Sequence, residues 1–405
     1  MPMTALLARP VADVINAAQQ LLARRMGASV KLVDPVDLGG SGRTLVLRVR
    51  VAENTFSLPR TLIIKAVRQS ARGGLGAEPG VSSVDSAFLR EAVSYQFATA
   101  LARSDRPGPD LLAQDLQGRL LILSDLGVGA KLSKILCDGS PAMIGNSLMA
   151  YAQALGRLHA ATAGREGDFT ALLRRAEVAH HSDGVAAQAI TAADELPKLL
   201  EEQLELTVPD AVVDQIRRGR RLFIGGRFPA FSPADLCPDN VIVNDDVRFI
   251  DYEWGGFRDA TLDVAYALAS FPGCLCRYDL TADRADAMVD AWRAEVVGIW
   301  PQLRDDAVLA RRVLEAQLQW VWLSTYWFLP EDHARIAAAR DHGLTAARSH
   351  ALPARWAGLR DAAGRTGWDE LAEFAAAMTS ALEAQWRPKK SAAAVRAGIG
   401  ARRRL

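Results

Sequence analysis

The sequence predicts an α+β protein with a small, mainly β N-terminal lobe and a larger, mainly helical C-terminal lobe. In the first third of the chain, β-branched residues gather in short segments separated by turn residues. From about residue 141 to residue 386, alanine and leucine recur at helical spacing. A β-rich unit followed by a helical unit favours two lobes with a cleft between them, and we place their joint at Ser124–Gly129.

The individual elements follow from the spacing of apolar residues. Val11–Leu22 predicts an amphipathic N-terminal helix. Three strands, a glycine-rich loop, a helix and a strand pair are expected next, at Val30–Val36, Thr44–Val51, Arg60–Val67, Gln69–Ser86, Ala87–Leu101, Leu111–Gln114 and Arg119–Leu123. Two further strand-like segments, Val241–Val243 and Val247–Asp251, interrupt the helical part. We therefore expect an N-terminal helix at 1–28, a β-rich lobe at 29–124, a helical lobe at 125–387 and a basic, disordered tail at 388–405.

Composition narrows the class of protein. The 405 residues are half hydrophobic, and 48 Lys+Arg balance 47 Asp+Glu, so no overall charge favours a nucleic-acid or membrane partner. The four scattered cysteines, Cys137, Cys237, Cys274 and Cys276, predict neither a disulfide framework nor a zinc site. A signal core and a membrane-spanning apolar run are both missing. These features favour a reduced, soluble, cytoplasmic protein, and they leave its oligomeric state open.

The strongest chemical signal lies in the helical part. Phe231–Asn240 (FSPADLCPDN) places Asp235 and Asn240 on one loop, and Asp251 ends the next strand, in VRFIDYEW. A hairpin would bring these three side chains together. Phosphoryl transfer needs such a set, with a carboxylate for the attacking hydroxyl and oxygen ligands for Mg²⁺ on the nucleotide phosphates. The alternative is that Asp and Asn serve here as ordinary turn residues.

The β-rich part carries a second signal. Lys65 stands in the apolar strand Leu62–Val67 and is the single lysine between Lys31 and Lys131. A buried ammonium needs a partner, and Glu91 on the following helix can supply one. Upstream, the backbone amides of a glycine-rich hairpin can cover phosphates, although many such hairpins are only turns. Its residues are Gly39, Gly40, Ser41 and Gly42.

The order of these motifs resembles the protein-kinase signature set: glycine-rich loop, strand lysine, helix glutamate, Asp-x-x-x-x-Asn and strand-ending Asp. In form it resembles the aminoglycoside phosphotransferase and choline kinase family. Leu155–Ala160 (LGRLHA), Ile250–Glu253 (IDYE) and Asp263–Ala265 (DVA) resemble further motifs of that family. The resemblance covers roughly Val36 to Leu344 and implies a protein-kinase-like, two-lobed fold.

The resemblance also implies roles for individual residues. Asp235 would be the catalytic base or would orient the acceptor hydroxyl, and Asn240 and Asp251 would bind Mg²⁺. Lys65 would contact the α- and β-phosphates while Glu91 holds it. The hinge that meets adenine would be the backbone of Ser124, Asp125 and Leu126. The implied cofactors are ATP (or GTP) and Mg²⁺, and the implied partner is a small-molecule acceptor such as an aminoglycoside-like antibiotic, an amino alcohol or a sugar.

The sequence departs from the family pattern at one place. Pro233 and Ala234 stand where the family usually has His-Gly before the catalytic Asp. The alternative function is therefore a nucleotide-binding pseudokinase that serves as an interaction module. A protein kinase is disfavoured because no Ala-Pro-Glu segment follows Asp251. Asp263 and His159 are expected to be structural rather than catalytic.

A tryptophan-rich helix is the candidate acceptor site. Glu315–Leu329 carries aromatic residues on more than one face, which is usual for a buried helix. The functional interpretation is that one aromatic pair packs inward while the other, Trp322 with Tyr326, lines a cleft. Acidic residues such as Glu253 or Asp259 would line it too, which suits a cationic or amphipathic acceptor.

Overall fold

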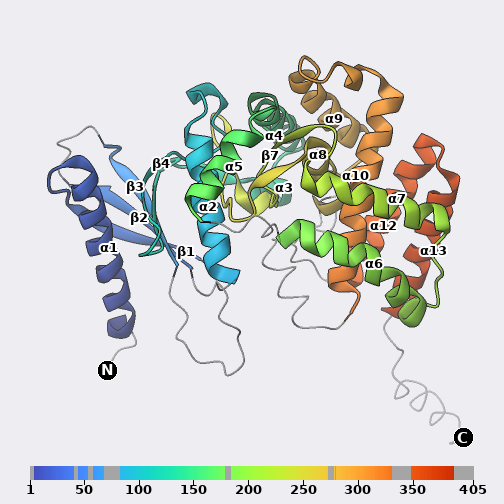
Figure 1. Ribbon diagram of the computed structural model, residues 1–405, viewed down its shortest axis with the longest axis horizontal. Coiled ribbons are helices and arrows are strands. Elements are labelled where there is room, and N and C mark those ends of the chain that lie inside the picture. Colours follow the sequence, from blue (N-terminus) through green and yellow to red (C-terminus); the bar gives the residue numbers. More distant parts are fainter. Residues whose placement is uncertain are drawn as a thin grey trace, which may run out of the picture.

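The chain folds into the two lobes expected from the sequence (Figure 1). The computed structural model describes residues 4–40, 44–52, 58–67, 83–177, 184–271, 278, 280–330 and 348–386. Several predicted features lie outside these ranges, namely Ser41, Gly42, most of the loop Gln69–Ser86, Cys274, Cys276 and the tail 388–405. No helix within the described ranges is both long and apolar enough to cross a membrane.

The N-terminal lobe is built on a five-stranded antiparallel sheet with strand order β1-β2-β3-β5-β4. Helix α1 precedes the sheet, and α2 lies between β3 and β4 in the chain. The elements are α1 (Thr4–Met26), β1 (Leu32–Gly39), β2 (Thr44–Val51), β3 (Thr61–Val67), α2 (Ser83–Thr99), the 3₁₀ turn η1 (Arg103–Asp105), β4 (Leu111–Asp115) and β5 (Leu120–Ser124).

Alternation along β3 gives this sheet two different faces. Leu62, Ile64 and Ala66 point to one side, where they join a core that includes Leu22 of α1. Because side chains alternate along a strand, Lys65 points to the opposite side. In Figure 1, α1 lies at the outer side of the sheet and α2 lies between the sheet and the helical lobe. The strand pattern therefore aims Lys65 toward the other lobe.

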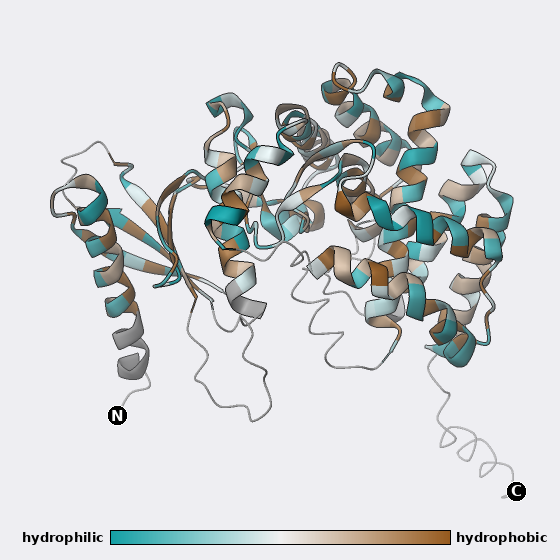
Figure 2. Cartoon of the chain, in the orientation of Figure 1, coloured by the Kyte–Doolittle hydropathy of each residue, from teal (hydrophilic) through white to brown (hydrophobic). Residues whose placement is uncertain are grey.

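The C-terminal lobe is mostly helical and encloses the largest core, and brown apolar segments line its interior in Figure 2. Two small sheets, β6-β8-β9 and β7-β10, lie on the chain between its helices. The first segments are β6 (Ala130–Lys131), α3 (Leu132–Asp138), α4 (Pro141–Thr162), α5 (Glu166–Arg175), α6 (Gly184–Leu204), α7 (Asp210–Gly219), η2 (Arg220–Ile224), β7 (Pro229–Ser232), η3 (Pro238–Asn240), β8 (Val241–Val243) and β9 (Val247–Phe249). The remainder are β10 (Gly256–Asp259), α8 (Ala260–Ser270), α9 (Ala282–Val296), η5 (Pro301–Arg304), α10 (Asp306–Phe328), α12 (Arg348–Thr366) and α13 (Asp369–Gln385).

The structure differs from the expected elements at several places, among them the short strand β6, which was not expected, and β9, which ends at Phe249, two residues before Asp251. Helix α1 extends well beyond Val11–Leu22 at both ends, and α2 begins at Ser83 rather than Ala87. Strands β7 and β10 were not expected. Each has four residues, and they pair with each other from Pro229–Asp259 to Ser232–Gly256. Four residues are too few to show an alternating pattern. The strand conformation of such a segment depends on its partner strand.

A buried polar chain ties the helices to the loop after β7. The Trp292 indole N–H donates to Nδ1 of His159 (2.9 Å), so the His159 proton lies on Nε2, which donates to Asp263 (3.0 Å). Asp263 also accepts from the hydroxyl of Ser232 (2.6 Å), and that hydroxyl in turn accepts from the backbone N–H of Ala234 (3.0 Å). The structural roles expected for His159 and Asp263 agree with these contacts, which hold the loop carrying Asp235.

Candidate active site

Lys65 lies at the centre of a cluster of acidic side chains between the two lobes. Its ammonium contacts Glu91 Oε1 at 2.7 Å and Asp251 Oδ1 at 2.6 Å. The Glu91 side chain is 2% exposed, whereas that of Asp251 is 36% exposed. Glu91 is therefore an internal partner for Lys65, and Asp251 presents a carboxylate that a ligand can reach.

Asp251 and Asn240 come together because of a short antiparallel hairpin. Strands β8 and β9 pair from Val241–Phe249 to Val243–Val247. Beyond the last pair, the Ile250 N–H donates to the Asn240 carbonyl (2.9 Å). Because Ile250 is bonded to Asn240, the next residue in the chain, Asp251, lies close to Asn240.

Asp235 lies on a strained turn between β7 and η3. Its N–H donates to the Pro233 carbonyl (2.9 Å), and Ala234 between them has φ +66°, which defines a γ-turn of the rare, strained kind. The carboxylate accepts from Asn240 Nδ2 (2.8 Å), from Cys237 N (3.2 Å) and, over a longer distance, from the Tyr266 hydroxyl (3.4 Å). Ala234 thus adopts a conformation that glycine would adopt without strain.

Negative charge accumulates around the single ammonium. Burial disfavours the charged form of Lys65, but Asp251 and Glu91 hold its pKa well above the ordinary value. Burial raises the pKa of Glu91 to about 7 despite the attraction of Lys65. Burial and repulsion from Asp251 raise the pKa of Asp235 to about 7 and that of Glu253 to about 8. An added cation would relieve this repulsion.

The donor set fits a magnesium ion that is shared with phosphates. In the described part of the chain, no three His, Cys, Asp or Glu side chains form a ready cage for a metal ion. Mg²⁺ bound to a nucleotide does not need one, because it takes one or two protein oxygens together with phosphate oxygens and water. Asp251 offers a reachable carboxylate. Asn240 uses its amide nitrogen on Asp235, so its amide oxygen is the atom that can serve as a ligand.

The predicted hinge is held by backbone and side-chain hydrogen bonds from both lobes. Ser124 N donates to the Asp110 carbonyl (2.9 Å), and Asn244 Nδ2 donates to the Leu126 carbonyl (3.0 Å). Partial burial disfavours the charge of Asp125, but hydrogen bonds from the backbone N–H of Gly127 and from the Arg48 guanidinium hold its pKa below the ordinary value. The side chain of Asp125 is thus engaged in holding the hinge.

The described half of the glycine-rich hairpin requires glycine. Gly39 has φ +87°, a conformation that other residues rarely adopt. At Gly40, an added Cβ would lie 2.2 Å from the Thr44 carbonyl oxygen.

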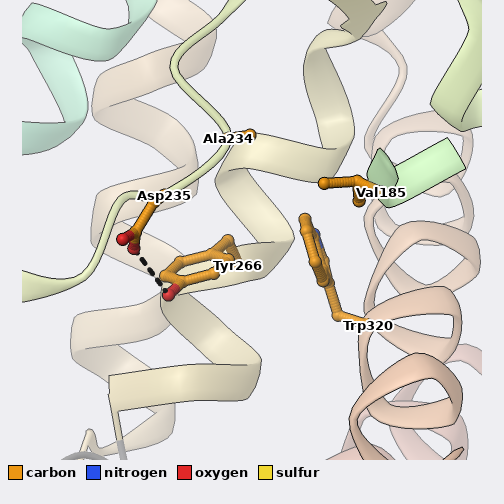
Figure 3. Close-up of a pocket in the computed structure, with 5 residues that line it drawn as sticks. All are labelled: Val185, Ala234, Asp235, Tyr266 and Trp320. Carbon is orange, nitrogen blue, oxygen red and sulfur yellow. Dashed lines mark hydrogen bonds between the residues drawn. The ribbon is translucent and has the colours of Figure 1, made fainter. Parts of the chain in front are cut away.

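A small cavity opens beside Asp235, on its helical-lobe side (Figure 3). Its volume is about 10 Å³, close to that of one water molecule. Asp235 and Tyr266 lie at one side of it and Trp320 of α10 faces them, and the lining is completed by Val185 and Ala234. The Trp320 N–H donates to the Leu262 carbonyl (2.7 Å), so its ring presents an apolar surface to the cavity.

Two expectations for the acceptor site were wrong. Trp322 does not line this cavity, because it packs toward α6, where its N–H donates to the Ala192 carbonyl (2.9 Å). Side chains two residues apart on α10 point about 200° apart around the helix axis. Trp320, and not Trp322, therefore faces the cavity beside Asp235. Asp259 is 1% exposed and caps α8 by accepting from Thr261 N (3.1 Å). It is therefore a structural residue.

Three residues that contact the site were not expected from the sequence: Tyr95, Ser232 and Tyr266. Tyr95 lies four residues after Glu91, on the same face of α2, and Tyr266 lies three residues after Asp263 on α8. This helical spacing was the available signal. For Ser232 no signal existed, because its role depends on its contact with Asp263.

Several solved structures are similar to this chain. One is a choline/ethanolamine kinase family protein from Mesorhizobium loti (15% identity, 92% of this chain and 99% of that chain covered, TM-score 0.45). Another is APH(2")-IIa in a ternary complex with streptomycin and ATP (15%, 80% and 94%, TM-score 0.44). A third is a fructosamine-3-kinase homologue from Haemophilus somnus (14%, 80% and 95%, TM-score 0.41).

No family model matches the chain, and no curated protein matches it. The solved structures are distant in sequence and their TM-scores lie below 0.5. The geometry of the site is therefore the basis for any functional assignment.

The raised pKa of Asp235 predicts that Asp235→Asn stabilises the fold at alkaline pH. The folded-state pKa of about 7 lies above the ordinary 3.8, so ionising this carboxyl opposes folding, increasingly so from about pH 4 to about pH 7. The full penalty is on the order of 4 kcal/mol. Thermal unfolding should show Asp235→Asn more stable than the wild type at pH 8, with the difference shrinking toward pH 4. An equal difference at both pH values would contradict this electrostatic assignment.

Proposed function

We propose that this protein is an ATP- and Mg²⁺-dependent phosphotransferase that acts on a hydroxyl group of a small molecule. The observation that supports it best is the position of Lys65 between Glu91 and Asp251, with Asp235 and Asn240 bonded to each other nearby. A cationic group for phosphates, oxygen ligands for a hard cation and a carboxylate for the acceptor are the parts that phosphoryl transfer requires.

The nucleotide would lie between the lobes. Lys65, held by Glu91, would contact the α- and β-phosphates, and the hairpin Gly39–Gly42 would cover them with backbone amides. Asn240 and Asp251 would hold Mg²⁺, which neutralises phosphate charge when it is bound. The base would meet the backbone of the hinge at Ser124–Leu126.

Asp235 would act on the acceptor. Its carboxylate would orient the acceptor hydroxyl and take its proton as the acceptor oxygen bonds to the γ-phosphorus. The bond from that phosphorus to the β–γ bridging oxygen breaks, and ADP leaves. A carboxyl group whose pKa is about 7 is matched to proton transfer near neutral pH.

The surroundings of Asp235 favour a cationic or amphipathic acceptor. The Tyr266 hydroxyl bonds to the carboxylate, and the Trp320 ring lies against the Tyr266 ring in the same cavity. Aromatic faces beside a negative charge attract organic cations, and the same faces pack against apolar groups. The cavity is too small for such a molecule, so the acceptor would have to widen it on binding.

A substrate panel tests the function. Purified protein, Mg²⁺ and labelled ATP are combined with amino alcohols, aminoglycosides and sugars, and phosphorylated products are identified by mass spectrometry. We expect transfer to at least one class. With its exposed carboxylate removed, Asp251→Ala should lose activity by at least about 10³-fold, because it lacks a metal ligand.

Two outcomes would contradict this proposal. Turnover of Asp251→Ala within a few-fold of the wild type would remove Asp251 from the metal site. Tight nucleotide binding without transfer to any acceptor would instead support the pseudokinase alternative, in which Pro233 and Ala234 mark an inactive loop.

Trp320 should govern acceptor affinity. Replacing its ring in Trp320→Leu should raise the KM for the acceptor about 2- to 30-fold, the range of aromatic–cation contacts, and leave the KM for ATP unchanged. The matched control is Trp322→Leu, which removes an equally buried indole, also bonded to a backbone carbonyl, away from the cavity. Equal effects of the two variants on acceptor KM would show that the loss of core packing is responsible.

A further inference from the structure

Tyr95 joins α2 directly to the backbone of Asp251. It lies one helical turn after Glu91 and is 2% exposed. Its hydroxyl oxygen accepts the N–H of Asp251 at 3.0 Å, and its ring stacks on Tyr252, with 4.6 Å between ring centroids. Helix α2 therefore contacts Lys65 through Glu91 and contacts Asp251 through Tyr95.

The contact matters because Asp251 has an unusual backbone. Its φ is +69°, in the left-handed region, which costs a non-glycine residue roughly 1–2 kcal/mol. The hydrogen bonding between the two hairpin segments ends at Ile250, the residue before Asp251, whose N–H donates to the Asn240 carbonyl. Asp251 N–H thus points away from the hairpin, and Tyr95 supplies its acceptor. This orientation directs the carboxylate toward Lys65.

Further contacts hold the same segment against α2. The Arg90 guanidinium donates to the Gly255 carbonyl (3.1 Å). Gly255 also approaches Ser94 so closely that an added Cβ would lie 2.3 Å from the Ser94 hydroxyl. The chain from Asp251 to Gly255 is accordingly packed along one face of α2.

We propose that Tyr95 is a positioning residue that sets the metal-binding orientation of Asp251. The inference rests on the proposed function, because it assigns Asp251 to Mg²⁺. Through Glu91 and Tyr95, α2 determines the positions of both Lys65 and Asp251. A metal–nucleotide complex then finds the lysine and the carboxylate already oriented.

The stacked tyrosines provide a matched pair of variants. The Tyr252 hydroxyl is buried and has no hydrogen-bond partner among the described residues, whereas the Tyr95 hydroxyl bonds to Asp251. Tyr95→Phe and Tyr252→Phe therefore each remove one buried oxygen from the same stack, and both keep the rings. The difference between them isolates the hydrogen bond to Asp251.

Calorimetric titration of a non-hydrolysable ATP analogue, with Mg²⁺ and with a chelator, measures the effect without turnover. For Tyr95→Phe we expect affinity in Mg²⁺ to fall about 5- to 30-fold, the value of one buried hydrogen bond, and affinity in chelator to stay within twofold. The KM for Mg²⁺ in the transfer assay should rise by a similar factor. Tyr252→Phe should match the wild type in each measurement.

The outcomes separate this inference from the proposed function. Wild-type protein whose nucleotide binding does not respond to Mg²⁺ would overturn the proposed function and the role of Tyr95 with it. A magnesium response that is normal in the wild type and unchanged in Tyr95→Phe would overturn the positioning role alone. Equal losses of affinity in Tyr95→Phe and Tyr252→Phe would also overturn the positioning role, because a general loosening of the stacked rings would then explain both.

Discussion

The ion pairs of Lys65 with Glu91 and Asp251 are the interaction on which the site depends. Lys65 comes from the sheet of the N-terminal lobe, Glu91 from α2 and Asp251 from the hairpin of the helical lobe, so three separate elements meet at one ammonium. A buried charge without partners is strongly unfavourable. The requirement to pair Lys65 therefore holds the two lobes together at this point.

Two of the six described non-glycine residues with positive φ lie on either side of this chemistry. Ala234 and Asp251 both have positive φ, and each is held by a buried hydroxyl, that of Ser232 for Ala234 and that of Tyr95 for Asp251. Strained conformations persist where the surroundings enforce them, and they cluster at functional sites. The chain uses alanine at 234, where the related motif has glycine, and the contact from Ser232 offsets part of that strain.

The sequence predicted what depends on local pattern. The apolar strand Leu62–Val67 was enough to predict that Lys65 needs a partner and that Glu91 can supply it, and a hairpin was expected to bring Asp235, Asn240 and Asp251 together. The two lobes were likewise predicted correctly. The pairing of β7 with β10 and the choice of Trp320 over Trp322 depend on packing between distant segments. The pattern in Glu315–Leu329, which carries aromatic residues on more than one face, does not show which tryptophan faces Asp235.

The central claim is that the acidic cluster around Lys65 is shaped to hold a metal–nucleotide complex. The most direct measurement is the affinity of the wild-type protein for a non-hydrolysable ATP analogue at saturating Mg²⁺, compared with its affinity in excess chelator. We expect at least about tenfold tighter binding with Mg²⁺, since the cation relieves repulsion among Glu91, Asp235, Asp251 and Glu253. Equal affinity in the two conditions, or no binding in either, would contradict it.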